Sequence, residues 1–237
     1  GSLIRRTEIA TGKVREMSWD QRGRLVEIDD LSGAGQVATQ TVKFTYDAFN
    51  RRISKTVDAD GAGPGGERTT HFVYDRDDVL LDFVDADGSG TGASPTLAQR
   101  YLHGPVVDQI LAQQDAAGNV FWMLTDHLGT VRDLVNNSGS VVNHLTYDSY
   151  GNVISETDPS VDSRYQFTGR EFDAETKLNY HRGRYYVATS GRFLSEDPIG
   201  FEGQDFNLAR YVSNSPIKFS DPEGTVEFNA SNVVGTV

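Results

Sequence analysis

The chain has 237 residues, of which 37% are hydrophobic and 24 are glycine; it has no cysteine and a formal net charge of −12. The absence of cysteine excludes disulfides, thiolate nucleophiles and cysteine-ligated metal sites. The acidic balance argues against nucleic acid or an anionic membrane as the main partner. No apolar run approaches the ~18 residues of a membrane-spanning helix, so we expect no membrane insertion.

A ten-residue pattern occurs five times along the first two thirds of the chain. Each copy starts with an aromatic residue or Thr followed by Asp, at Trp19, Tyr46, Tyr74, Thr125 and Tyr147. Three positions after the Asp stands Gly23, Asn50, Asp78, Gly129 or Gly151. Gly, Asn and Asp accept a positive φ most readily, so each copy predicts strand, tight turn, strand. The near-constant spacing predicts copies of one unit stacked side by side.

In chain order, we expect residues 1–13 to be a lead-in that starts with a cloning scar. Residues 14–158 are expected to be a strip of these hairpins without a helix of useful length. Alternating patterns at 42–46 and 70–74 predict half-buried strands. The longer interval after the third copy leaves room for a degenerate copy near residues 99–105.

The repeat aspartates are expected to bond turn backbone, and the aromatic residues beside them to pack in the core or in cross-strand ladders. Asp-x-Asp-Gly at 58–61 and 85–88 hints at calcium loops, but Thr69 and Thr96 stand where such a loop needs Glu. The five histidines show no ligand spacing. We therefore predict neither a metal nor a cofactor.

After Pro159 the sequence becomes richer in Arg and Tyr. Two Asp-Pro-x-Gly motifs, at 197–200 and 221–224, are typical of turns, because Pro fixes φ and Gly readily takes a left-handed conformation. We expect residues 159–225 to form a C-terminal domain and 226–237 a short tail.

The aromatic-Asp units resemble the YD repeats of the RHS family. The C-terminal third resembles the RHS-associated core domain of bacterial RHS proteins and of ABC-type insecticidal toxin C subunits, through motifs at 168–178, 182–186, 191–200, 207–212 and 220–224. The resemblance covers nearly the whole chain. It implies an all-β fold in which YD-repeat hairpins form a curled antiparallel sheet or barrel-like shell. The core segment would turn inward as a plug.

The resemblance also implies a function. The shell would encapsulate a C-terminal cargo or toxin, which is its partner, and release it by one aspartate-dependent, intramolecular cut. A bacterial, secreted or cell-surface setting is implied too. In the family the cut follows Asp-Pro-x-Gly-Leu. Here Asp221 and Gly224 belong to that motif, and the expected scissile bond joins Thr225 to Val226.

Matched to the family's motifs, Asp197 is the expected catalytic aspartate, Asp173 the second carboxylate and Arg184 the assisting arginine. Peptide hydrolysis by carboxyl groups needs one ionised group to activate water and one protonated group to polarise the carbonyl. An arginine can orient a carboxylate or stabilise the oxyanion. An intramolecular substrate has a high effective concentration, so even a weak peptidase can cut itself once.

Other interpretations stay open at this stage. Arg184 can instead form a structural salt bridge or stack on neighbouring tyrosines, and Asp221 can serve only to shape its turn. Thr225 replaces the family's Leu, which leaves open a non-enzymatic β-scaffold with an inactive cleavage site. A surface adhesion module is a third interpretation. A strip of so few repeats has open edges, so it would close around its own C-terminal segment or pair with another copy.

Overall fold

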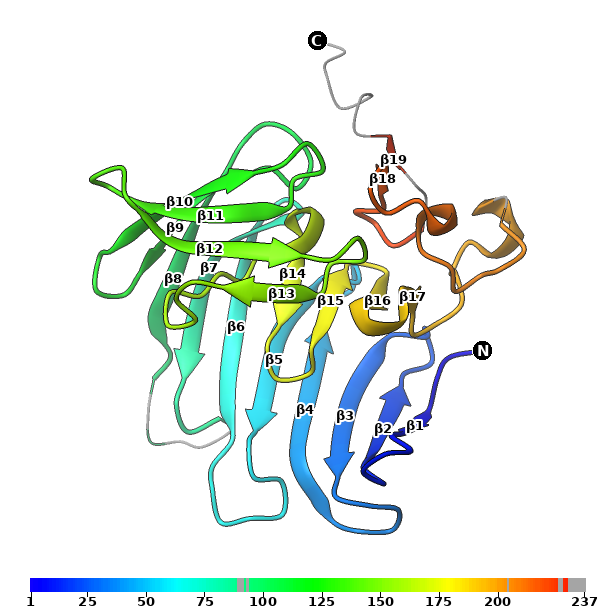
Figure 1. Cartoon of the computed structure of the whole chain (residues 1–237). Helices are drawn as coiled ribbons and strands as arrows, with labels where there is room; N and C mark the ends of the chain where they lie inside the picture. Colours follow the sequence, from blue (N-terminus) through cyan, green and yellow to red (C-terminus); the bar gives the residue numbers. More distant parts are fainter. Residues whose placement is uncertain (89–91, 93, 204, 226–227, 230–237) are drawn as a thin grey trace. The chain divides into compact units, whose positions relative to one another are not determined.

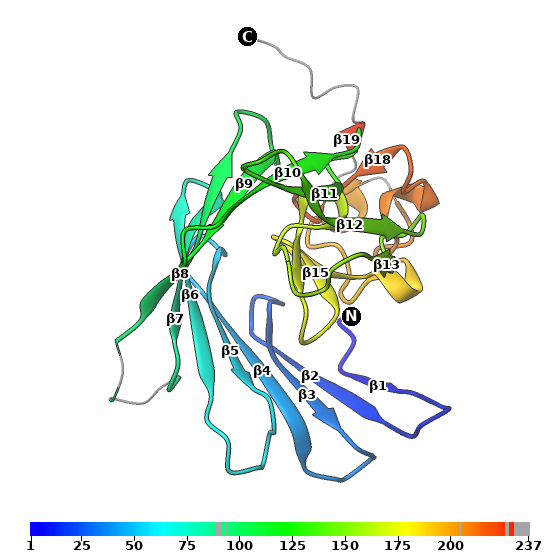
Figure 2. The same ribbon diagram turned by 60° about the vertical axis from the view of Figure 1, so that its left-hand side comes forward.

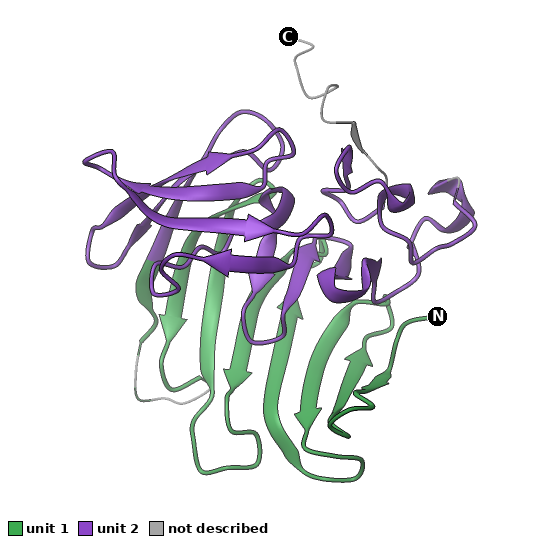
Figure 3. Ribbon diagram, in the orientation of Figure 1, with its two compact units in different colours: residues 1–98 green, residues 99–237 purple. Residues whose placement is uncertain are grey.

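The computed structural model describes residues 1–88, 92, 94–203, 205–225 and 228–229. Every regular element in this part of the chain is a β-strand or a short 3-10 turn, and all pairings are antiparallel, so the predicted all-β class is confirmed. The chain divides into two compact units, residues 1–98 and 99–237 (Figure 3). The borders expected at residues 13, 158 and 225 stay predictions.

Unit 1 is an antiparallel sheet in which each strand pairs with the next one along the chain (Figure 1). Its strands are β1 (Arg5–Thr7), β2 (Val14–Trp19), β3 (Leu25–Leu31), β4 (Ala38–Tyr46), β5 (Arg52–Asp58), β6 (Arg68–Asp75) and β7 (Asp78–Asp85). In β4, Val42 and Phe44 are buried whereas Lys43 and Thr45 are exposed. The alternation predicted for half-buried strands is therefore confirmed there.

Unit 2 begins within β8 (Thr96–His103) and continues the hairpin pattern up to β13, after which a separate small sheet begins (Figure 2). The further hairpin strands are β9 (Ile110–Asp115), β10 (Val120–Thr125), β11 (Val131–Asn136), β12 (Val141–Tyr147) and β13 (Val153–Glu156). A four-stranded sheet follows, with β14 (Glu171–Asp173), β15 (Leu178–His181), β16 (Arg184–Val187) and β17 (Arg192–Phe193). The last pair is β18 (Phe219–Ser220) and β19 (Phe228–Asn229).

Four 3-10 turns connect the later strands of unit 2: η1 (Phe167–Gly169), η2 (Ala188–Ser190), η3 (Gly200–Gly203) and η4 (Val212–Asn214). The segment after β13 is tied to the hairpins of the same unit. The amide of Val131 donates to Gln166 O at 3.1 Å, and Asn152 Nδ2 donates to Ala188 O at 3.1 Å. The C-terminal third thus packs on the hairpin strands of unit 2, and its expected role as an inward plug stays a prediction.

The repeated turns are closed by their aspartates, as predicted, in four of the five copies. In each of these the Asp amide donates to the carbonyl four residues on, and Oδ1 accepts the amides two and four residues on. The aspartates are Asp20, Asp47, Asp126 and Asp148. The expected positive φ occurs at Gly23, Asn50, Gly129 and Gly151. Asp115 and Asn136 close turns of the same kind that lack the preceding aromatic residue, so the sequence pattern missed them.

The third copy differs, and the expected turn corner at Asp78 is wrong. Strand β6 extends to Asp75 and β7 starts at Asp78, and these two residues pair with each other. The turn between them is therefore only two residues long, and the positive φ falls on Arg76. Continued strand pairing has replaced the five-residue turn.

Consecutive copies are joined by an arginine that follows the turn. Arg24 Nη2 lies 2.7 Å from Asp20 Oδ2, and its guanidinium lies 4.8 Å from the ring centre of Tyr46 in the next copy. Tyr46 in turn donates its hydroxyl to Leu25 O at 2.7 Å. Arg51 repeats this arrangement with Asp47 and with the next copy's Tyr. Asp20 and Asp47 thus each hold an arginine against the Tyr of the following copy, which confirms the ladder role predicted for the aromatic residues at Tyr46 and Tyr74.

We expect Asp47→Ala to lower the free energy of unfolding of unit 1 by about 1–2 kcal/mol, because two backbone amides and Arg51 lose their acceptor. Asp75 is the matched control. It holds the same place in its copy, but within the described chain its carboxylate accepts none of the corresponding turn amides. Asp75→Ala should therefore change stability by roughly 0.5 kcal/mol or less. Urea unfolding of both variants measures the difference, and equal losses would contradict the capping role.

Candidate active site

The β15–β16 hairpin carries the arginine around which the site is built. His181 pairs with Arg184 across the two strands, and Arg182 and Gly183 form the two-residue turn between them. Arg182 has a φ of 49°, in the left-handed region that costs a non-glycine residue ~1–2 kcal/mol. The turn directs Arg184 into the interior, where only 4% of its side chain is exposed.

The guanidinium of Arg184 is paired with two carboxylates and two carbonyls. Its Nη2 lies 2.9 Å from Asp197 Oδ2 and 3.2 Å from Asp221 Oδ2. Its Nη1 donates to Leu208 O at 2.9 Å, and its Nε donates to Gly224 O. A buried guanidinium is stable only when its charge and its donors are matched in this way. Arg184 therefore fixes separate loop segments around one point.

Asp197 opens the first Asp-Pro-x-Gly turn, which forms as predicted. The Gly200 amide donates to Asp197 O at 2.9 Å, and the Ile199 amide donates to Asp197 Oδ1 at 3.0 Å. Burial raises the pKa of the Asp197 carboxyl, and this effect outweighs the opposite effects of the Ile199 amide and the Arg184 charge. A carboxyl with a raised pKa is suited to hold a proton and donate it.

Asp221 opens the second turn and reaches the predicted cleavage site. The Gly224 amide lies 3.4 Å from Asp221 O, and the Thr225 amide donates to Asp221 Oδ1 at 2.9 Å. One carboxylate oxygen of Asp221 thus holds the residue before the expected scissile bond, and the other binds Arg184. Val226, on the far side of that bond, lies outside the described residues.

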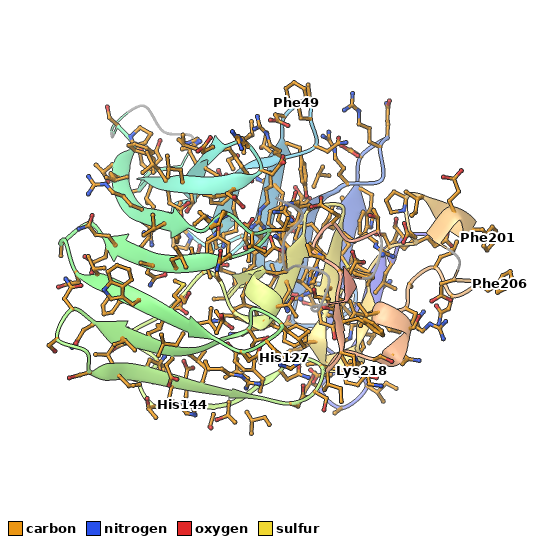
Figure 4. All side chains as sticks on the ribbon, turned by 90° about the horizontal axis from the view of Figure 1, so that it is seen from above. Phe49, His127, His144, Phe201, Phe206 and Lys218 are labelled. Atoms are coloured by element: carbon orange, nitrogen blue, oxygen red, sulfur yellow. The ribbon has the colours of Figure 1, made fainter. Side chains whose placement is uncertain are left out.

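The Thr225 carbonyl and the Asp197 carboxylate both lie beside Gly203, at the end of η3. A Cβ added to Gly203 would lie 3.5 Å from Thr225 O and 3.7 Å from Asp197 Oδ2. The loop around this glycine carries Phe201 and Phe206, which are exposed and point away from the protein (Figure 4). Gly203 itself thus places no side chain between these two groups, and the side chain of Ile199 also lies beside it.

Asp173 lies in the same small sheet but at the other end of it. It pairs with Leu178, three residues along β15 from His181, a distance of ~10 Å at ~3.3 Å per residue. Its carbonyl accepts the amides of Thr176 and Lys177 in the β14–β15 turn. The structure thus brings Arg184, Asp197, Asp221, Gly224 and Thr225 together and does not bring Asp173 to them.

His181 is a site residue that sequence reasoning missed. It is fully buried, and its Nδ1 donates to Asp221 O at 2.6 Å. The rings of Tyr186, Phe193 and Tyr211 surround it at centroid distances of 5.6 to 5.7 Å. Its place directly before the Arg-Gly-Arg turn was the available signal, because a hairpin partner of Arg184 must face the same region.

Burial lowers the pKa of His181 to about 3, and the nearby Arg170, Arg184 and Arg182 act in the same direction. An unfolded histidine titrates near 6.5. Between these two values the unfolded chain binds more protons than the folded one, so the stability that His181 contributes is present above about pH 6.5 and falls as the pH drops.

We expect His181→Phe to flatten the pH dependence of stability between about pH 6 and 4, where the wild-type histidine contributes a slope approaching ~1.4 kcal/mol per pH unit. The replacement keeps a ring among the aromatic side chains and removes the titrating nitrogens. Urea unfolding followed by the near-ultraviolet circular dichroism of the tyrosine cluster measures the slope. Equal slopes in the two proteins would contradict a buried, neutral His181.

Most of the site residues lie in a segment that matches a known family. Residues 107–222 match the family model described as teneurin YD-shell. The tRNA3(Ser)-specific nuclease WapA of Bacillus spizizenii is 30% identical over 213 residues, and the toxin protein Tse5 of Pseudomonas aeruginosa is 28% identical over 250 residues. The chain belongs to the RHS/YD-repeat family. These matches take in 87% and 95% of the RHS/YD chain but only 8% and 18% of the two relatives.

Solved structures support the same fold. The Photorhabdus luminescens Tc holotoxin pore contains a region that aligns with a TM-score of 0.70 at 20% identity. The alignment covers 94% of the RHS/YD chain and 10% of the pore chain. The likeness shows that the repeats adopt the strand arrangement of known toxin shells, as the resemblance implied.

The described part of the RHS/YD chain shows no sign of two other kinds of site. None of its helices has the length and apolarity to cross a membrane. None of its His, Asp and Glu side chains gather in groups of three or more that could hold a metal ion. The chemistry that the site itself supports is that of two carboxyl groups and one guanidinium beside a peptide carbonyl.

Proposed function

We propose that this chain is the part of an RHS/YD shell that encloses a C-terminal cargo of its parent protein and cuts the link to that cargo after Thr225. One observation carries the proposal. Arg184 holds Asp197 and Asp221 on a single nitrogen, next to the carbonyl of the expected scissile bond. Two acids and an arginine at one peptide bond form an arrangement suited to hydrolysis.

The roles follow from the contacts of each carboxyl. Asp197 has the raised pKa and lies near Thr225 O, so it is the acid that polarises the carbonyl. Asp221 is held by Arg184 and accepts the proton of the attacking water. Water adds to the Thr225 carbonyl carbon, and the bond to the Val226 nitrogen then breaks as that nitrogen takes up a proton. The products are a Thr225 carboxylate and a Val226 amine.

Geometry favours Asp221 over Asp173 as the second carboxyl group. Asp221 shares Arg184 with Asp197, whereas Asp173 lies at the far end of β15. Asp173 then belongs to the architecture of the small sheet, where it ends β14 and is 2% exposed.

The proposed partner is the parent's own segment after residue 225. Two relatives are named as a nuclease and a toxin, which favours a toxin-like cargo and a secreted or cell-surface bacterial protein. Self-association through β1, an exposed strand that pairs with β2, is a second proposed contact. A scaffold that never cuts remains the competing function, because Thr225 replaces the family's Leu.

The deciding experiment is a time course of intact mass after cell-free synthesis. The wild-type chain should lose residues 226–237, and Asp197→Asn should keep its full mass, because the amide cannot donate the proton. Glu202→Gln is the matched control. It removes one negative charge from the exposed face of the neighbouring 3-10 turn and should leave the cut unchanged. Full mass in all three proteins would establish the scaffold instead.

The two candidate second carboxyls are separated by a further pair of variants. Asp221→Asn should slow the cut by about a hundredfold or more, within the range expected for loss of a general base. Asp173→Asn should keep the rate within a few-fold, because the residue is ~10 Å along β15 from the site. The same mass time course measures both rates. The reverse order would restore Asp173 as the catalytic partner.

A further inference from the structure

Four consecutive residues of the β15–β16 turn donate to four consecutive carbonyls of the second Asp-Pro-x-Gly turn. His181 Nδ1 reaches Asp221 O at 2.6 Å, and Arg182 Nη1 reaches Pro222 O at 3.1 Å. The Gly183 amide reaches Glu223 O at 3.0 Å, and Arg184 Nε binds Gly224 O. The donors advance by one residue as the acceptors advance by one, so the two segments lie in a fixed register. We call these four donors, residues 181–184, the carbonyl clamp.

We propose that the carbonyl clamp selects the bond to be cut by counting backbone residues from Asp221, so that the fifth residue of the turn supplies the scissile carbonyl whatever its side chain. This inference rests on the proposed self-cleavage. Carbonyls are identical in every residue, so the four contacts recognise position and carry no information about side chains at 222–225. A count of this kind accommodates Thr225 where the family has Leu.

The close approach of the two turns supports the register. A Cβ on Gly183 would lie 2.9 Å from Glu223 O, closer than side chains come to backbone oxygens. A Cβ on Gly224 would lie 2.5 Å from His181 O, and Gly224 has a φ of 69°. Glycine on both sides therefore lets the backbones touch. Larger residues would push the turns apart and break the four contacts.

An ion pair with Asp108 holds the Arg182 guanidinium in the position from which it donates to Pro222 O. Its Nη2 lies 2.9 Å from Asp108 Oδ1, and Asp108 also binds Arg170. The same guanidinium therefore bridges a buried carboxylate and the Pro222 carbonyl. The left-handed φ of Arg182 fits this interpretation, since backbone strain at a non-glycine residue persists where its surroundings hold it.

The Thr225 carbonyl comes immediately after the clamp. Among the residues that the structure describes, none donates a hydrogen bond to Thr225 O, and the atom lies beside Gly203 near the Asp197 carboxylate. The clamp thus fixes the chain up to Gly224 and leaves the next carbonyl beside Gly203, which the Asp197 carboxylate also adjoins.

The test is insertion of one glycine between Gly224 and Thr225 in the full chain, followed by intact mass. The clamp still holds residues 221–224, so the cut should move to the bond between the inserted glycine and Thr225. The N-terminal product then has the inserted glycine in place of Thr225 as its last residue. A cut that still follows Thr225, or an insertion variant that is not cut while the wild type is, overturns the counting mechanism. Thr225→Leu and Thr225→Val should both be cut at the original bond within a few-fold of the wild-type rate.

Arg182 provides a second arm with a matched control. Arg182→Ala should slow the cut about tenfold or more, as expected for loss of one hydrogen bond from a charged donor, and should yield products cut at more than one bond. Arg182→Lys should restore the single position. Glu202→Gln, which removes one exposed charge outside the clamp, should behave as wild type. A single cut position at wild-type rate in Arg182→Ala would overturn the clamp.

Hydrogen exchange separates failure of the clamp from failure of the proposed peptidase. In the Asp197→Asn chain the Gly183 amide should exchange slowly, because it donates to Glu223 O. In the Asp197→Asn chain that also carries Gly224→Ala, the added Cβ pushes the turns apart, and the same amide should exchange at least about tenfold faster. This difference, together with a wild-type chain that keeps its full mass, would retain the clamp and refute only the peptidase. Equal exchange while the wild type cuts itself would refute only the clamp.

Discussion

The buried guanidinium of Arg184 is the constraint on which the C-terminal part of unit 2 depends. A positive charge with 4% of its side chain exposed requires negative partners and acceptors within hydrogen-bond distance. Asp197, Leu208, Asp221 and Gly224 meet that requirement from segments that share no regular sheet pairing with one another. Without this charge, these loops would lose the shared ion pairs and hydrogen bonds that hold them in one arrangement.

The repeats solve a different problem by purely local means. Each Asp-closed turn satisfies its own backbone amides within five residues, and Arg24, Arg51 and Arg132 contact the ring of the following copy. Stability therefore accumulates from one neighbour to the next, as expected for repeat proteins. The C-terminal segment instead relies on contacts between residues about forty apart in sequence. A single substitution should therefore affect mainly its own turn and the neighbouring copy in the repeats, whereas in the C-terminal segment it should also affect residues distant in sequence.

This difference explains what could be predicted from sequence. The turns at Asp20 and Asp47 follow from residue spacing, because every hydrogen bond involved is local. The third copy was mispredicted because the spacing cannot say how far strand pairing extends, and β6 and β7 pair up to Asp75 and Asp78. The pairing of Arg184 with Asp197 was expected from family resemblance. The placement of Asp221 rather than Asp173 beside them depends on which end of β15 faces the loops. Backbone acceptors such as Leu208 O cannot be predicted from residue type, because every residue has a carbonyl.

The pairing of β18 with β19 has a consequence for what a cut could accomplish. These strands flank the turn that contains Thr225, and they pair antiparallel with Phe219 opposite Asn229 and Ser220 opposite Phe228. A break at Thr225 would therefore open the turn of a hairpin whose two strands are still paired with each other. Cleavage of the chain and dissociation of the downstream segment would be separate events. Between them lies a nicked state, and its lifetime is set by how readily the two short strands β18 and β19 separate.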